Sequence, residues 1–259
     1  MNYSLLCELI NNQSINEEYF ILQFFWDHPA PKAGQFFMLK PQRTTVFLPR
    51  PFAVFEYNQE QKIVKFLISK CGKGTKELSA LNPGEKVQLT GPTGNTFSDY
   101  LPEISSAGNI ALVSGSAGIA PFAALVAEKP EYNFHVFAGF RHGFSEKEIE
   151  NCVLGAAIKA KKIVITAEDG RNALVGRIVD FIFEPESYDV IFGCGPTPML
   201  NVLKQKCELK KVPCFICLES RFACGVGACH GCTIHTINGN RRCCKDGPIF
   251  PAGDVIFDV

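Results

Sequence analysis

Residues 109–121, Asn109-Ile-Ala-Leu-Val-Ser-Gly115-Ser-Ala-Gly118-Ile-Ala-Pro121, decide the fold of the middle of this chain. An apolar run leads into a turn that holds two glycines, and the turn leads into the start of a helix. The free N–H groups of such a turn point outward and suit a phosphate or a nucleotide. Taken alone, the turn is equally compatible with an ordinary connection between a strand and a helix.

The sequence around this stretch, about residues 104–205, alternates strand-like and helix-like segments. Buried strands are predicted at 109–114, 134–138, 162–166 and 189–192, and helical spacing occupies 120–128, 145–161, 176–183 and 197–206. Such alternation predicts βαβ units and a parallel sheet. Ligands of such sheets bind at the carboxyl ends of the strands.

Two further turns follow predicted strands of this region. One is Thr166-Ala-Glu-Asp-Gly170, and the other is Cys194-Gly195-Pro196-Thr-Pro-Met199. Three turns at strand carboxyl ends favour a shared ligand crevice over three unrelated connections. The candidate nucleotide-binding residues are Gly115, Gly118, Cys194, Gly195 and Pro196.

The first region, up to about residue 103, contains short apolar segments separated by turn residues. The segments at 17–26, 35–41, 51–57, 62–69 and 86–90 include many aromatic and β-branched residues. Short strands at this spacing predict an antiparallel barrel or sandwich.

Two motifs stand out in this β region. Arg50-Pro51-Phe52-Ala53 offers a guanidinium fork suited to phosphate, and Gly72-Lys73-Gly74-Thr75 offers backbone donors to a second phosphate oxygen. Each motif alone also fits an ordinary surface turn.

The third region, about residues 206–259, is rich in glycine and cysteine and has too little apolar sequence for a core of its own. Cys224, Cys229, Cys232 and a later cysteine have the C-x4-C-x2-C…C spacing of a plant-type 2Fe–2S site. Asn238-Gly239 predicts a hairpin that returns the fourth thiolate to the loop.

Two questions stay open at this site from the residues alone. Cys243 and Cys244 compete for the fourth position, because neighbours in a strand face opposite ways. Zinc bound by Cys214-x2-Cys217 and Cys229-x2-Cys232 is the rival reading. In that alternative, Cys214 and Cys217 must both face the same ion. They lie in a predicted buried strand, however, and residues three apart in a strand point to opposite faces.

The composition narrows the function classes. Lys and Arg together number 26, as do Asp and Glu, so the zero net charge argues against binding to nucleic acid or to an anionic membrane. No apolar run approaches the roughly 18 residues of a membrane span, and the N-terminus lacks the pattern of a secretory signal. We therefore expect a cytoplasmic protein, in which most of the twelve cysteines, clustered after residue 190, indicate metal binding rather than disulfides.

Together these motifs resemble the ferredoxin–NADP reductase superfamily. The order R-P-F-A, G-K-G-T, G-P-T-G-N, G-S-A-G-I-A-P and C-G-P-T-P-M covers most of the chain. The stretch from Glu219 to Cys232 and the sequence Cys244-Lys-Asp-Gly-Pro-Ile-Phe250 closely resemble the electron-transfer subunits of type 1B dihydroorotate dehydrogenase. The resemblance implies a multidomain α/β and all-β protein with a flavin-binding antiparallel β-barrel at 1–103, an NAD-binding parallel-sheet α/β domain at 104–205, and a small 2Fe–2S domain at 206–259.

The resemblance also implies roles for individual residues. The family's fourth cluster cysteine stands two residues before Asp-Gly-Pro, which selects Cys244 over Cys243. The cluster ligands it implies are Cys224, Cys229, Cys232 and Cys244. The FAD-binding residues it implies are Arg50, Pro51, Phe52, Ala53, Gly74 and Thr75, with Leu67, Ile68 and Ser69 matching a backbone contact to the flavin. Ala53 replaces the serine that is usual in the family.

The function that the resemblance implies is electron transfer in pyrimidine biosynthesis. Electrons pass from the FMN of a dihydroorotate-oxidising partner subunit, in a heterotetramer, through the cluster and FAD to NAD⁺. A flavin must stand between the other centres, because nicotinamide exchanges two electrons as a hydride and a cluster accepts one. A related reductase subunit serving sulfide or ferredoxin is the alternative, since one fold serves several such reactions. A third reading, a non-catalytic iron–sulfur redox sensor, predicts neither bound FAD nor diaphorase activity. No acid–base constellation is found, so no catalytic side chain is predicted.

Overall fold

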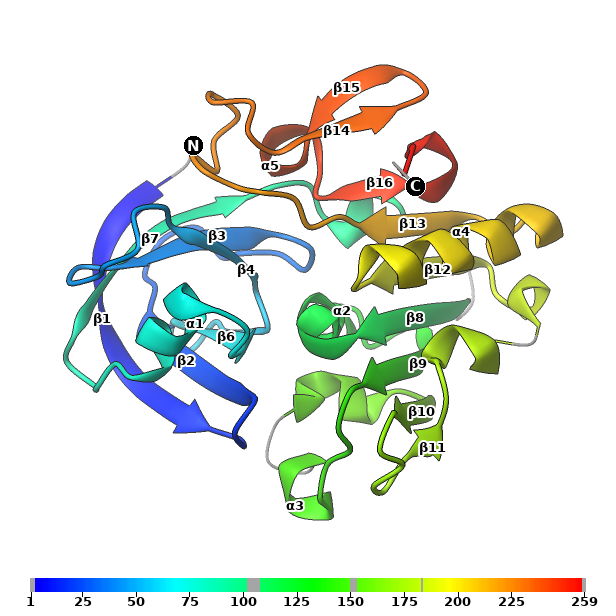
Figure 1. The fold of residues 1–259 in the computed structure, drawn as a ribbon, viewed down its shortest axis with the longest axis horizontal. Helices are drawn as coiled ribbons and strands as arrows, with labels where there is room; N and C mark the ends of the chain where they lie inside the picture. The colour runs from blue at the N-terminus through cyan, green and yellow to red at the C-terminus, as the bar shows by residue number, and fades with distance from the viewer. Residues whose placement is uncertain (1–2, 102–107, 150–152, 183, 258–259) are drawn as a thin grey trace.

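The computed structural model describes residues 3–101, 108–149, 153–182 and 184–257 (Figure 1). This part of the chain forms two seven-stranded sheets and a two-stranded hairpin. The predicted boundary between residues 103 and 104 lies outside the described residues. No helix among the described residues is long and apolar enough to cross a membrane.

The first sheet is antiparallel and curls into a half-barrel, which confirms the all-β prediction for this region (Figure 1). Its strand order is β4-β3-β7-β1-β2-β6-β5, and bulges in β1 and β7 supply local twist. In its core Trp26, Phe37 and Phe66 pack edge to face in series. The elements are β1 (Tyr3–Ser14), β2 (Tyr19–Phe25), β3 (Phe36–Pro41), β4 (Arg50–Ala53), β5 (Glu56–Asn58), β6 (Ile63–Ser69), α1 (Lys73–Ser79) and β7 (Lys86–Thr93).

The second sheet has the order β11-β10-β9-β8-β12-β13-β16 and is parallel except for its edge strand β16, as the alternating pattern predicts. Residues of β8 alternate between two cores, one shared with α2 and one shared with α4. Helices therefore cover both faces of the sheet. The elements are β8 (Asn109–Gly115), α2 (Ala120–Glu128), β9 (Asn133–Phe140), β10 (Lys162–Ala167), β11 (Leu174–Val175), β12 (Val190–Cys194), α4 (Thr197–Lys210), β13 (Cys214–Cys217) and β16 (Ile249–Pro251).

Two predicted helices are shorter than the sequence suggests. In 145–161 the described residues form α3 (Glu146–Glu148) and a 3-10 turn, η4 (Gly155–Lys159), while 150–152 lie outside the description. Gly155 has a φ of +51° and faces the Phe55 ring so closely that a Cβ would lie 2.5 Å from it, so this backbone turns where a helix would continue. In 176–183 only η5 (Ile178–Phe181) is helical, and residue 183 is outside the description.

The C-terminal segment shares its packing with the rest of the chain. The predicted boundary at 205/206 falls within α4, and β13 and β16 extend the parallel sheet beyond it. The hairpin of β14 (Thr233–Thr236) and β15 (Gly239–Arg242) leads into α5 (Cys243–Asp246), which lies beside the half-barrel strand β7 (Figure 1). The ring of Phe222 packs edge to face on Phe36 of β3 at 5.2 Å between centroids, and Met38 joins the same core.

Asn95 joins the end of the half-barrel to the C-terminal segment. Its side chain donates to the Ile249 carbonyl at 2.8 Å and accepts from the Ile249 N–H at 3.0 Å. The same amide donates to the Tyr100 hydroxyl at 2.8 Å. Ile249 is fully buried, so its backbone N–H and carbonyl need hydrogen-bond partners. The Asn95 side chain bonds both groups, in place of a neighbouring strand.

We expect Asn95→Ala to lower the free energy of unfolding by about 1–3 kcal/mol, because it leaves the buried Ile249 N–H without its partner, while the Ile249 carbonyl keeps a bond from the Tyr100 hydroxyl at 3.2 Å. Urea denaturation followed by the fluorescence of Trp26, the single tryptophan, measures the change. Asn109→Ala, which removes an exposed amide at the start of β8, is the matched control. Equal stabilities of the two variants would contradict the role of Asn95.

Candidate cofactor and iron–sulfur site

The loop between β13 and β14 carries three of the predicted cluster cysteines, and the sequence folds it tightly against the half-barrel. Gly225 has a φ of +70°, and a Cβ there would lie 2.4 Å from Met38 Cγ. Gly227 has a φ of +82°, and a Cβ there would meet the Lys245 side chain at 2.8 Å. Only glycine combines this backbone with this close approach, which explains the spacing of glycines between the cysteines.

The backbone of the loop points N–H groups at the cysteine sulfurs. Cys224 Sγ accepts from the N–H groups of Val226 and Cys229, both at 3.4 Å. The remaining three sulfurs each accept one such bond: Cys229 from Gly231 at 3.4 Å, Cys232 from Cys244 at 3.4 Å, and Cys244 from Gly227 at 3.1 Å. Donors of this kind stabilise thiolates, which are the form that binds iron.

The four sulfurs form two neighbouring pairs. The sulfurs of Cys224 and Cys229 lie near enough to interact, as do those of Cys232 and Cys244. A cluster with two irons and four thiolates needs two ligands per iron, so this pairing fits a 2Fe–2S centre. Cys224 and Cys229 form the outer pair, and Cys232 and Cys244 are buried.

The two pairs differ in how readily they ionise. Burial opposes ionisation of Cys224, but the N–H groups of Cys229 and Val226 outweigh it and lower its pKa to about 6. Burial, together with the nearby Cys232 sulfur, raises the pKa of Cys244 to about 12. Binding of iron by Cys244 therefore releases a proton, which couples occupancy of the site to pH.

Cys243 and Cys244 lie in the first turn of α5 and not in a strand, so the strand argument for choosing between them is wrong. The strand β15 ends at Arg242. Cys243 is completely buried in the core with Ile216 and Phe250. Cys244 faces the loop, because its sulfur receives the Gly227 N–H and its own N–H reaches the Cys232 sulfur.

The zinc alternative does not form. On β13, the Cys214 sulfur lies near that of Cys207 in α4, and the Cys217 sulfur lies near that of Cys194 in β12. The neighbouring sulfur, followed by burial, raises the pKa of both Cys194 and Cys214 well above the usual range of a thiol. Cys214 and Cys217 thus belong to opposite faces of the sheet, as a strand requires.

The structure brings the two predicted FAD motifs together. Arg50, at the start of β4, lies over Gly74 at the start of α1, where a Cβ would be 3.0 Å from Arg50 Nε. One guanidinium nitrogen donates to the Leu48 carbonyl at 3.1 Å, which leaves the rest of the fork for a ligand. The Thr75 hydroxyl is nearly buried and accepts from the N–H groups of Cys71 and Gly72, both at 3.0 Å, so it fixes the turn that precedes α1.

The other FAD residues lie on β4 and β6. Pro51, Phe52 and Ala53 are half-buried and pair with β3. The side chains of Leu67 and Ile68 are buried in two different cores, so only their backbone is available to a ligand. The ladder between β6 and β5 ends at Lys65, and within the described residues the edge of β6 from Leu67 to Ser69 has no strand partner on that side.

A cleft of about 1190 Å³ separates the half-barrel from the carboxyl edge of the parallel sheet. Of the predicted nucleotide-binding residues, Gly115 and Pro196 line it, as do Ser69 from the flavin motif and Thr166 from the third turn. Glu168, which also lines it, belongs to the predicted turn 166–170, whereas the sequence analysis missed four further charged residues, which belong to no motif: Glu18, Lys70, Arg141 and Arg177.

Gly118, Cys194 and Gly195 lie behind this cleft, where two turns pack against each other. A Cβ on Gly118 would lie 2.2 Å from the Cys194 carbonyl oxygen, and one on Gly195 would lie 2.8 Å from the Gly115 nitrogen. These glycines allow the turns after β8 and β12 to touch. Across the cleft, the Tyr19 hydroxyl of β2 is 2.7 Å from the Ser116 hydroxyl, and Ser116 has a φ of +54°.

The cluster loop exposes Val226, Ala228 and Cys229, which are candidates for contact with a partner. Phe222 does not belong to that surface, because it is 8% exposed and packs inward on Phe36.

The comparisons with known proteins agree with this arrangement. A family model described as the oxidoreductase FAD-binding domain matches residues 6–97, and one described as the iron–sulfur cluster binding domain of dihydroorotate dehydrogenase B matches residues 219–256. The chain is similar to the dihydroorotate dehydrogenase B (NAD(+)) electron transfer subunits of Clostridium acetobutylicum and of Caldanaerobacter subterraneus subsp. tengcongensis. It is 36% identical to the first over 88% of this chain and 87% of the relative, and 33% identical to the second over 99% and 100%.

Solved structures share the fold. The NADH-dependent reduced ferredoxin–NADP oxidoreductase matches with a TM-score of 0.81 and 23% identity, over 97% of this chain and 90% of that one. A ferredoxin–NADP⁺ reductase from Neisseria gonorrhoeae matches with a TM-score of 0.65 and 18% identity, over 81% and 92%.

The fold, the flavin domain and the cluster segment define an oxidoreductase that uses FAD and an iron–sulfur cluster. Within that class, the chain belongs to the family of dihydroorotate dehydrogenase B electron transfer subunits. The resemblance inferred from the sequence motifs is thereby confirmed.

We expect Cys244→Ser to abolish the cluster and Cys243→Ser to keep it, because only the Cys244 sulfur lies among the loop donors. Iron and acid-labile sulfide in anaerobically purified protein, about two of each per wild-type chain, provide the measurement. The opposite result would show that Cys243 is the fourth ligand.

Proposed function

We propose that this chain carries electrons between the FMN of a dihydroorotate-oxidising partner subunit and NAD, as part of a heterotetramer in the cytoplasm. The observation that carries the proposal is that one chain combines the paired cysteines, the Arg50–Gly74 motif and the interdomain cleft. Such a relay must exchange electrons both singly and in pairs. The cluster and FAD together supply both kinds of exchange.

The residues of this chain bind and orient the cofactors. Cys224, Cys229, Cys232 and Cys244 are the proposed cluster ligands. Arg50 and the N–H groups at Gly74 and Thr75 hold the FAD diphosphate, and the edge of β6 at Leu67–Ser69 meets the flavin ring. The nucleotide occupies the cleft between Ser69 and Gly115, where Lys70, Arg141 and Arg177 favour its negative charge.

Two other functions make different predictions. A reductase subunit serving ferredoxin or sulfide binds the same cofactors but does not couple to a dihydroorotate-oxidising partner. An iron–sulfur sensor shows neither bound FAD nor NADH oxidation with an artificial acceptor. Mixing the purified chain with the FMN subunit of a dihydroorotate dehydrogenase B decides among them, because only the proposed function gives dihydroorotate-dependent reduction of NAD⁺.

We expect Arg50→Ala to weaken FAD binding by about ten- to a hundredfold, since a charge-assisted phosphate contact contributes roughly 1.5–3 kcal/mol. The cluster should remain, because Arg50 lies on β4 and none of the cysteine contacts involves it. Flavin content after gel filtration at low concentration measures the loss. Arg241→Ala on β15 is the control, and equal flavin retention in both variants would show that Arg50 is only a turn residue.

We expect Val226→Glu to impair dihydroorotate-dependent NAD⁺ reduction with the FMN subunit, because a charge at an interface core disfavours docking. Val226 is 41% exposed, and the substitution keeps the N–H that serves Cys224. NADH oxidation by the isolated chain with an artificial acceptor should persist. The control is Leu209→Glu at the end of α4, which is 83% exposed. Equal coupled rates in the two variants would place the partner elsewhere.

A further inference from the structure

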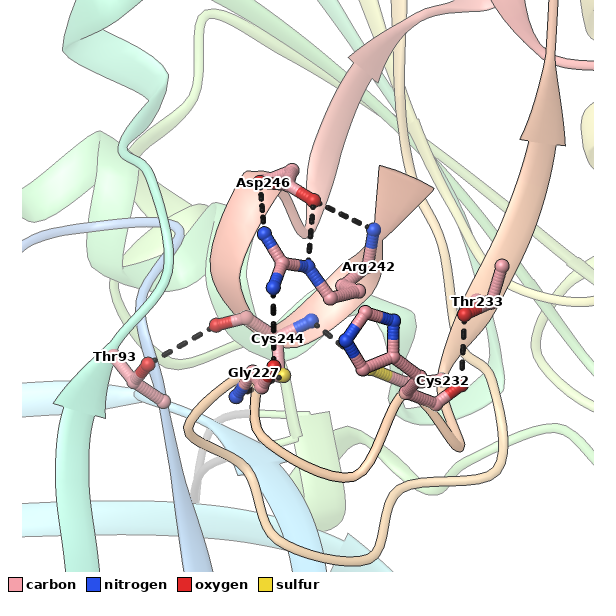
Figure 2. Close-up of polar contacts among 8 residues, drawn as sticks. Thr93, Gly227, Cys232, Thr233, Arg242, Cys244 and Asp246 are labelled. Carbon is pink, nitrogen blue, oxygen red and sulfur yellow. Dashed lines mark hydrogen bonds and ion pairs between the residues drawn. The ribbon is translucent and has the colours of Figure 1, made fainter. Parts of the chain in front are cut away.

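Arg242 links three parts of the cluster segment (Figure 2). Its guanidinium donates through Nε to Asp246 Oδ2 at 3.2 Å, through Nη2 to Asp246 Oδ1 at 3.4 Å, and through Nη1 to the Gly227 carbonyl at 3.1 Å. Its backbone N–H also donates to Asp246 Oδ2 at 2.8 Å. The side chains of Arg242 and Asp246 are both about three-quarters buried, so this pair is held more firmly than an exposed ion pair.

The pair acts on the cluster loop through Gly227. While Arg242 fixes the carbonyl of Gly227, the N–H of the same residue donates to Cys244 Sγ at 3.1 Å. That is the shortest of the backbone bonds to the four sulfurs, whose other members measure 3.4 Å. Asp246 closes the turn that carries Cys244, so both ends of this N–H···S bond depend on the same ion pair.

The positive charge of Arg242 also lies near the Cys244 sulfur, because Nη1 is bonded to the Gly227 carbonyl and the N–H of Gly227 donates to Cys244 Sγ. The guanidinium is a permanent cation. Hydrogen bonds to cluster sulfurs and net charge both set the reduction potential of a cluster. A donor that strengthens as negative charge accumulates on the sulfur favours the reduced form.

We propose that the Arg242–Asp246 pair is a positioning device that holds the Gly227 N–H against the Cys244 sulfur and thereby raises the reduction potential of the 2Fe–2S cluster. The inference rests on the proposed cluster site and concerns neither a ligand nor a catalytic residue. Arg242 acts through Gly227, and Asp246 acts through Arg242.

Asp246→Asn separates positioning from simple charge, because the two predict opposite signs. Removing a negative charge beside the cluster favours the reduced form and raises the potential. Releasing Arg242 from its carboxylate loosens Gly227 and lowers the potential. A spectroelectrochemical titration of the anaerobic holoprotein, followed at the visible absorption of the cluster, should show a lower potential for Asp246→Asn. An unchanged or higher potential overturns the proposal.

Arg242→Lys keeps the positive charge but cannot hold Asp246 and the Gly227 carbonyl in one planar fork. We expect the ratio of reduced to oxidised cluster at a fixed potential to fall about tenfold, which corresponds to about 59 mV for a one-electron couple. Arg241→Gln removes a neighbouring exposed charge and is the control for bulk electrostatics. A wild-type potential in Arg242→Lys, or an equal shift in Arg241→Gln, overturns the proposal even if Asp246→Asn fails to fold.

The experiment also separates this inference from the proposed function. A wild-type chain without iron and labile sulfide contradicts the cluster site itself. If the wild-type chain carries a cluster and Arg242→Lys leaves the reduction potential of that cluster unchanged, only the positioning role is contradicted.

Discussion

The C-terminal segment cannot bury a core by itself, and its dependence on β3 of the half-barrel organises the molecule. Phe222, Cys243 and Cys244 share one core with Phe36 and Met38 of β3, and this core continues into β13 and β16. Gly225 lets the loop approach Met38 to a distance at which no Cβ fits. The Thr93 hydroxyl of β7 then donates toward the carbonyls of Cys244 and Gly225, at 3.1 and 3.4 Å. The site for the cluster is therefore built onto the flavin domain rather than attached to it by a linker.

The predicted nucleotide-binding turns of the parallel sheet likewise depend on close contact with each other. The glycine-rich turns after β8 and β12 indicate a ligand crevice, but the structure shows that several of their glycines serve packing first. Gly118 and Gly195 allow one turn to rest on the other, while Gly115 and Pro196 reach the cleft. Two turns in such close contact restrict each other's backbone, and a restricted floor would favour a fixed orientation of the nucleotide that we propose binds in the cleft.

Much of this architecture could be predicted from local sequence, because the deciding signals are local. Apolar periodicity located α2 and the central strands, and cysteine spacing located the cluster loop. What sequence reasoning missed depends on tertiary contacts. The turn of α5 places Cys243 and Cys244 differently from a strand, Gly155 interrupts a helical pattern at Phe55, and Phe222 turns inward toward a ring 186 positions earlier in the chain. Apart from Glu168 in the turn 166–170, the charged residues of the cleft carry no motif, because the fold alone brings them to the cleft.

The position of Ala53 connects the predicted flavin motif with the cluster loop. Ala53 on β4 pairs directly with Phe36 on β3, and the Phe36 ring contacts Phe222 in the cluster loop. One residue of β3 thus adjoins the flavin motif through its backbone and the cluster loop through its side chain. The serine usual in the family would add a hydroxyl to this strand, whereas alanine leaves only backbone groups to bond a flavin there. At the proposed FAD site, the β4 backbone therefore supplies the polar groups that a serine hydroxyl would otherwise supplement at this position.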